Sequence, residues 1–256
     1  MESQQASQFR RTPLKYLIMI ALFITYSAKA IVIRHDVDDK KYRELGEQYS
    51  ASVAYIRSRG CASTLIAPKW LLTAAHCVAG REKSITKATH LGDKYPIEAI
   101  VVHPQFDLAN DKVYDIALIQ LKKPILKGSP AKLYTRKNEQ GKPVVFIGSG
   151  YFGNGLEGIT KRNHKQRGAT NTIIGVSEQV IKFKFDVPSK ASHLEGISGP
   201  GDSGGPAFIN IDSQLYVAGV SSYQVVNEFE EAHYGVEERY TRVSTYYPWI
   251  ESVVNK

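Results

Sequence analysis

The chain has 256 residues, of which 43% are hydrophobic and 23% are charged. This is an ordinary globular composition, long enough for a sizeable core, and it excludes an intrinsically disordered chain. The formal net charge is +8, but the Lys and Arg residues are dispersed along the chain. This dispersion favours a mixed solvated surface over a basic binding tract, and we expect no nucleic acid partner.

The first thirty residues have the organisation of a secretory signal peptide. Three basic residues precede an apolar run over 16–26, and Ala28 and Ala30 follow it. The run is too short to span a bilayer comfortably, and the alanines occupy the two positions that a signal peptidase recognises, which argues against an uncleaved membrane anchor. Cleavage after Ala30 leaves a mature chain that begins at Ile31. We therefore expect a secreted or periplasmic protein with no stable membrane insertion.

Beyond this signal peptide (1–30), short apolar or β-branched runs separated by Gly and Pro predict antiparallel strands. We expect strands over 52–56, 62–66, 70–73, 97–102 and 116–121 in one module, and over 144–148, 171–176, 179–185, 215–221 and 239–243 in a second. Only the tail, 245–255, spaces its apolar residues at helical intervals, and 153–168 is expected to be an exposed loop. The predicted boundaries within 31–256 are about 31–138, about 139–243, and about 244–255 for the helix.

Cys61 and Cys77 are the two cysteines of the chain. Because disulfides persist outside the cytosol, we expect these residues to pair rather than to remain free thiols. Closing this loop stabilises the fold by about 3 kcal/mol in the chain-entropy model and fixes the segment that carries His76. The other histidines lack paired ligand spacing, so we expect no metal site and no cofactor.

The stretch Gly201-Asp202-Ser203-Gly204-Gly205-Pro206 carries the strongest chemical signal. A serine flanked by several glycines sits on a sharp turn with its hydroxyl and nearby amides exposed. An alcohol is a weak nucleophile, so it needs a base, a carboxylate that orients the base, and donors for developing negative charge. The base is found in Leu72-Thr73-Ala74-Ala75-His76-Cys77 and the carboxylate in Tyr114-Asp115-Ile116-Ala117-Leu118. Taken alone, the histidine would be interpreted as a packed core residue, the aspartate as a cap at a strand end and the glycine-rich stretch as a turn. Taken together, the three segments predict nucleophilic catalysis.

These three segments, in this order, resemble the motifs of the trypsin/chymotrypsin-like serine proteases, and the resemblance covers the whole mature chain. It implies an all-β fold of two six-stranded antiparallel barrels with a C-terminal α-helix, and an active site in the cleft between them. It also implies a catalytic triad of His76, Asp115 and Ser203, with the amides of Gly201 and Ser203 as oxyanion hole. The expected activity is that of a serine endopeptidase, a monomer that hydrolyses protein or peptide substrates through an acyl-enzyme.

The resemblance also connects the leader to the site. In this family a new Ile-Val terminus folds inward, and its ammonium pairs with the Asp before the nucleophile, here Asp202. Cleavage after Ala30 exposes Ile31, so export itself is expected to activate the enzyme. Ile33 and Arg34 stand where the family has two glycines, which makes the inward turn less easy.

The resemblance places the specificity pocket in three segments. Its base is Ile197, so the basal Asp of trypsin-like specificity is absent. The other lining residues are expected to be Ser198, Gly199, Pro200, Ser222, Tyr223, Gln224 and Glu238. Gln224 replaces a usual glycine and narrows the entrance, and Gly199 replaces a usual cysteine. Glu238 predicts a preference for a basic, or mixed basic and aromatic, residue at the cleavage site; the alternative is a surface glutamate on a loop.

Two further interpretations concern origin and activity. The small number of cysteines and the direct leader junction suggest a bacterial-type secreted member of the family. The main alternative function is a catalytically silent cationic homologue that acts as a binding protein. The intact triad argues against it, since such homologues commonly lose one of these residues. An esterase is disfavoured because the serine motif differs from a G-x-S-x-G elbow.

Overall fold

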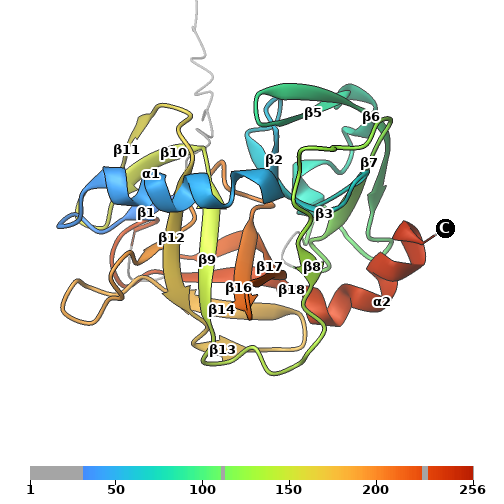
Figure 1. Cartoon of the computed structure of the whole chain (residues 1–256). Coiled ribbons are helices and arrows are strands. Elements are labelled where there is room, and N and C mark those ends of the chain that lie inside the picture. The colour runs from blue at the N-terminus through green and yellow to red at the C-terminus, as the bar shows by residue number, and fades with distance from the viewer. Residues whose placement is uncertain (1–30, 111–112, 227–229, 256) are drawn as a thin grey trace, which may run out of the picture.

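The computed structural model describes residues 31–110, 113–226 and 230–255, so the predicted signal peptide lies outside the described residues. Six strands form a closed barrel in the order β2-β3-β4-β7-β6-β5. They are β2 (Val53–Ile56), β3 (Cys61–Ala67), β4 (Trp70–Thr73), β5 (Lys87–His90), β6 (Asp93–Val102) and β7 (Ala117–Leu121). Figure 1 shows this barrel beside a second β module. Among the described residues, no helix is long and apolar enough to cross a membrane.

The second module consists of two sheets. The larger has the order β12-β9-β16-β17-β18-β14-β13, with β8 pairing with β17, and the smaller has the order β11-β10-β1-β15. The larger sheet contains β8 (Lys132–Leu133), β9 (Pro143–Gly148), β12 (Arg167–Thr172), β13 (Gly175–Val176), β14 (Val180–Lys184), β16 (Pro206–Ile211), β17 (Gln214–Val225) and β18 (Glu237–Arg242). The smaller contains β1 (Val32–Ile33), β10 (Tyr151–Asn154), β11 (Gly158–Arg162) and β15 (Gly196–Ile197). The expected mostly-β class is thus confirmed, with one closed barrel and a half-barrel sheet.

One of the hydrophobic clusters spans both modules. Ile116 and Val78 of the barrel belong to the same buried cluster as Phe208 and Val220 of the second module. The C-terminal helix α2 (Val243–Val254), predicted over 245–255, adds Ile250 to this cluster. A continuous apolar seam therefore fixes the cleft between the modules, since close-packed interiors resist relative sliding.

Two expectations about local structure are wrong. The predicted loop over 153–168 is largely β10, β11 and the start of β12, paired as antiparallel strands. Helix α1 (Asp39–Gln48) was not expected at all; it crosses β12 and β9 in Figure 1. It is capped by Asp38, whose side chain accepts from the Lys40 amide at 2.8 Å. Only Tyr42 and Gly46 are buried in α1, too few to give a hydrophobic period in the sequence.

Two buried arginines of the large sheet form ion pairs that attach neighbouring segments to it. Arg167 on β12 is fully buried and donates to both carboxylate oxygens of Asp39, at 2.5 and 3.0 Å, which ties α1 to the sheet. Arg242, at the end of β18, forms the same two-pronged pair with Glu139, at 2.9 and 2.6 Å. Burial raises the pKa of Glu139, but hydrogen bonds from Arg242 and Ser244 outweigh this effect and hold the pKa below its ordinary value.

Replacing Glu139 by Gln should destabilise the protein strongly, because the Arg242 charge stays buried without its counter-ion. We expect a loss of about 3–5 kcal/mol in the free energy of unfolding, measured by urea denaturation at pH 7. The matched control is Glu98→Gln, a change of the same chemistry on an exposed strand position of β6, which should stay within about 0.5 kcal/mol of wild type. Equal losses in both variants would refute a special role for the Glu139–Arg242 pair.

Candidate active site

His76 and Asp115 lie at the same end of two neighbouring strands of the first barrel, His76 just after β4 and Asp115 just before β7. His76 lies on the short helix η2 (Ala75–Cys77), joined to β3 by a disulfide between Cys61 and Cys77, as expected. The Nδ1 atom of His76 lies 2.8 Å from Oδ2 of Asp115, and the His76 backbone amide donates to Oδ1 at 2.9 Å. Asp115 therefore fixes both the ring and the backbone of the histidine, while Nε2, on the other side of the ring, lies 3.8 Å from the Cys77 Sγ atom.

Asp115 also receives bonds from the second module. The Ser222 hydroxyl donates to its Oδ2 at 2.6 Å, and the Thr241 hydroxyl donates to its backbone carbonyl at 2.8 Å. The side chain of Asp115 has no exposed surface. Tyr114, the residue before it, has a φ of 56°, a conformation uncommon for a bulky residue. The structure thus turns the chain sharply to bury one carboxylate at the junction of the modules.

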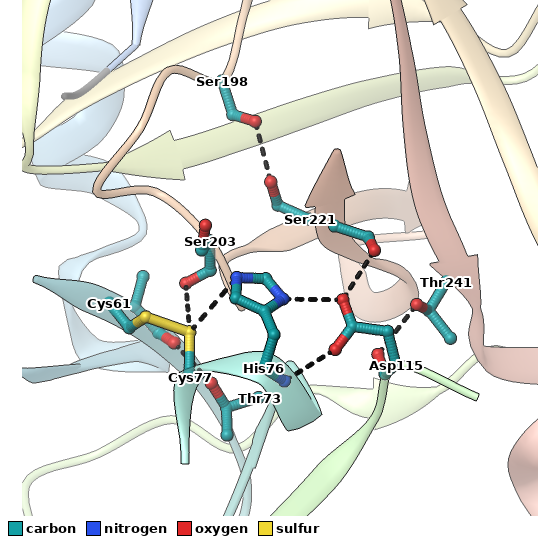
Figure 2. Close-up of polar contacts among 11 residues, drawn as sticks. Cys61, Thr73, His76, Cys77, Asp115, Ser198, Ser203, Ser221 and Thr241 are labelled. Carbon is teal, nitrogen blue, oxygen red and sulfur yellow. Dashed lines mark hydrogen bonds and ion pairs between the residues drawn. A yellow bond between two sulfur atoms is a disulfide. The ribbon is translucent and has the colours of Figure 1, made fainter. Parts of the chain in front are cut away.

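Ser203 lies beside this pair, on the Nε2 side of the His76 ring (Figure 2). Its backbone carbonyl accepts from the Ala62 amide of β3 at 2.8 Å, so the loop is anchored to the first barrel. Gly204, the next residue, has a φ of 79°, and a Cβ there would lie 2.2 Å from the Thr73 hydroxyl. Only glycine fits this close approach, which explains part of the glycine-rich motif.

The amides around Ser203 divide into two groups. Those of Asp202, Gly204 and Gly205 donate to carbonyl oxygens of the protein. Those of Gly201 and Ser203 have no acceptor in the described part of the chain. Buried or half-buried amides are normally paired, so two adjacent unpaired donors mark a place for an external oxygen. This is the arrangement expected of an oxyanion hole.

Asp202 points away from the cleft into the second module and is buried. Its carboxylate accepts from the Gly199 amide at 3.2 Å and from the Gly150 amide at 3.4 Å. Burial raises the pKa of Asp202 to about 7, in spite of these amides. Within the described ranges it forms no ion pair. Ile31 and Val32 are also fully buried, with Val32 paired with Gly153 of β10 and Ile197 of β15.

A pocket of about 90 Å³ opens beside Ser203. Its walls come from the segment before the nucleophile, from the end of β17 and from β18. It is lined by Ser198, Gly199, Pro200, Ser203, Ser221, Ser222, Tyr223, Gln224, Glu231 and Glu238. Seven of the eight residues expected to form a specificity pocket are thus brought together, and Ser221 and Glu231 were missed.

The eighth residue, Ile197, was assigned wrongly. It is fully buried in a cluster with Val32 and Phe185 rather than lining the cavity. Side chains alternate in direction along an extended chain, so Ile197 packs with Val32 and Phe185 while the next residue, Ser198, lines the pocket. Sequence spacing located the segment correctly but not the direction of the side chain.

Glu238 lies at the inner end of the pocket and is 1% exposed, so the alternative of a surface glutamate on a loop is wrong. It accepts from the Ser198 amide at 3.0 Å and from the Ser198 hydroxyl, which also contacts the Ser221 hydroxyl at 2.8 Å. Burial raises the pKa of Glu238 to about 8, despite the bonds from Ser198, and the nearby Asp202 and Glu231 add to this rise.

The family model named Trypsin matches residues 37–250, which is most of the chain. The chain belongs to the trypsin family. Its resemblance to that family, first suggested by three short motifs, is thereby confirmed.

Similar curated proteins come from insects and mammals. Phenoloxidase-activating factor 3 of Holotrichia diomphalia is 27% identical over 86% of this chain and 70% of its own length. Chymotrypsin-like elastase family member 1 of Canis lupus familiaris is 27% identical over 76% of this chain and 81% of its own length. Vitamin K-dependent protein C of Mus musculus is 26% identical over 77% of this chain but only 46% of its own length. These trypsin-family relatives give no support to the interpretation of a bacterial-type member.

Replacing Gly204 by Ala should damage the serine loop of this trypsin-family chain. The new Cβ combines a strained positive φ with a collision against Thr73 on β4, and we expect a loss of at least about 3 kcal/mol in the free energy of unfolding. The matched control is Gly141→Ala, whose φ is 78° but whose Cβ would meet nothing within 4 Å. This control isolates the cost of placing alanine at a positive φ, which is about 1 kcal/mol in the free energy of unfolding. Equal losses in urea denaturation would contradict the steric argument.

Proposed function

We propose that this chain is a secreted serine endopeptidase that works through an acyl-enzyme. The proposal is carried by one observation: a fully buried carboxylate, Asp115, holds His76 by Nδ1 and leaves Nε2 facing Ser203, the residue beside two unpaired amides. Relatives named as proteases, such as serine protease SP24D of Anopheles gambiae, are consistent with it. Protein or peptide substrates follow from this activity.

The proposed reaction uses these groups in two half-reactions. The Ser203 Oγ attacks a peptide carbonyl carbon while Nε2 of His76 takes the hydroxyl proton, and the carbonyl oxygen becomes an oxyanion held by the amides of Gly201 and Ser203. The tetrahedral intermediate collapses, the C–N bond breaks, and the leaving amine takes the proton from His76. A water then attacks the acyl carbon and gives a proton to His76. The C–O bond to Ser203 breaks, His76 returns the proton to Ser203 Oγ, and the acid is released. Asp115 orients the ring and stabilises its charged form throughout.

We further propose that signal-peptide removal after Ala30 activates the enzyme. Strand β1 lies between β10 and β15, and the amides that bind Asp202 belong to Gly150, directly before β10, and to Gly199, two residues after β15. A buried carboxylate without a counter-ion is costly, and a new α-ammonium at Ile31 would provide one. Pairing of Ile31 with Asp202 would order the loop that presents the amides of Gly201 and Ser203.

The first test combines N-terminal sequencing of the secreted protein with titration by a serine-directed phosphonate reagent. We expect an Ile31 terminus and stoichiometric labelling that is lost in Ser203→Ala, because the reagent needs an activated hydroxyl. An Ile31 terminus without labelling would instead support the silent binding homologue. Labelling that appears only after trimming of a longer terminus would replace activation by export with a zymogen step.

The Asp202 assignment predicts a pH-dependent difference in stability between leader-bearing and mature protein. Without the ammonium, the native pKa of about 7 exceeds the ordinary value of 3.8, so the native state keeps a proton that the unfolded state releases. Stability of the leader-bearing form should therefore fall as pH rises from about 4 to 7, by up to about 4 kcal/mol. The ammonium of Ile31 lowers this pKa and removes the loss.

We expect the melting temperature of the mature protein to exceed that of the leader-bearing protein by an amount that grows between pH 4.5 and 7.5. Both proteins carry Ser203→Ala to prevent self-cleavage. In a matched pair that also carries Asp202→Asn the difference should not change with pH. Glu238 is present in both proteins, so its contribution to the pH dependence cancels in the difference between their melting temperatures. A difference that is constant with pH when Asp202 is intact would show that Ile31 does not pair with it.

A further inference from the structure

One side chain spans the specificity pocket from wall to wall. The Nε2 of Gln224 donates to the Ser198 carbonyl at 2.7 Å, and its Oε1 accepts from the Ala232 amide at 3.0 Å. Ser198 belongs to the wall that precedes the nucleophile, and Ala232 belongs to the segment that leads into β18. Gln224 itself sits on β17, directly opposite Glu238 on β18. The carboxamide is therefore held at both ends by backbone groups of the two walls.

No disulfide can join these walls, because the two cysteines of the chain are already paired with each other. Ala232 is fully buried and has a φ of 68°, an unusual conformation for alanine, so the segment around it is closely constrained. Each of the two hydrogen bonds to backbone groups adds a modest net stabilisation to this side-chain position. Gln224 thus provides a polar connection between the walls, and keeping it requires the side chain to stay inside the pocket.

The space that remains is small. The cavity of about 90 Å³ is well below the roughly 150 Å³ that encloses a benzene ring. The Ser198 carbonyl, an acceptor in the pocket wall, already accepts a hydrogen bond from Gln224. Glu238, which also lines the pocket, accepts hydrogen bonds from the amide and the hydroxyl of Ser198. A long or aromatic side chain entering the pocket would have to displace the Gln224 carboxamide and break both of its bonds.

We propose that Gln224 sets the primary specificity of this enzyme: by bridging Ser198 and Ala232 it restricts the residue on the acyl side of the scissile bond, P1, to a small uncharged side chain. The proposal rests on the proposed peptidase function. The preference for a basic P1 residue, which was expected from Glu238, is then not expressed in the wild type. Removing the bridge opens the pocket to lysine and arginine, whose charge meets Glu238 and Glu231.

The test compares mature wild-type protein with Gln224→Gly and Gln224→Ala on peptide substrates that differ only at P1, with Ala, Lys or Phe. Active-site titration normalises each rate to folded enzyme. Wild type should prefer Ala, and the kcat/KM ratio of Lys to Ala should rise on the order of 10–100-fold in both variants. In Gln224→Gly/Glu238→Gln most of this rise should disappear. The matched control is Gln214→Gly, which removes a glutamine from the same strand away from the pocket.

A binding measurement separates this proposal from the peptidase proposal. All forms are made with Ser203→Ala, and p-aminobenzamidine, a fluorescent aromatic cation, is titrated into each. Wild type should bind it at least about 30-fold more weakly than Gln224→Gly does, whether or not the chain is a protease. Equal affinity in these two forms, or a wild type that already prefers Lys at P1, would overturn the role of Gln224. If the expected difference in binding is found but the protein is not labelled by the phosphonate reagent, only the proposed catalytic function is overturned.

Discussion

The arrangement of the cleft depends on the burial of one carboxylate, that of Asp115, at the junction of the two modules. Its side chain has no exposed surface, and it is stabilised by donors from both sides: the backbone and ring of His76 from the barrel, and the Ser222 hydroxyl from the second module. An ionised group buried in this way requires all of these partners, because each lost donor leaves charge uncompensated. The modules must therefore dock in one register, and that register aligns His76 with Ser203.

A second buried carboxylate, Asp202, gives the serine loop a different property. It has amide donors but no counter-ion among the described residues, and burial raises its pKa to about 7. The serine loop thus surrounds a buried carboxyl group that has hydrogen-bond donors but no counter-ion among the described residues. Such a group makes the local structure sensitive to any cation that reaches it, and this sensitivity is the physical basis of the activation that we propose for the chain terminus.

Polar side-chain contacts hold this protein together where covalent links are few. The single disulfide fixes the segment of His76 to β3. Elsewhere Arg242 and Glu139 join β18 to the segment before β9, and Glu195 caps its own loop by accepting from the amides of Asp186 and Ser192. Gln224 belongs to the same set of contacts. Hydrogen bonds of this kind impose geometry but yield more readily than a disulfide, so the pocket walls they join remain adjustable.

The sequence by itself determined most of the barrel strands, the disulfide, the family and the identity of the triad candidates. These features are encoded locally, in alternating apolar runs and in three short motifs around His76, Asp115 and Ser203. The tertiary structure alone decided helix α1, which has too few buried residues to show a period, and the direction of Ile197, which faces Val32 instead of the pocket. It also decided that Glu238 is buried and that Gln224 bridges Ser198 and Ala232. Burial and side-chain contacts between segments far apart in the chain depend on packing, which no local pattern records.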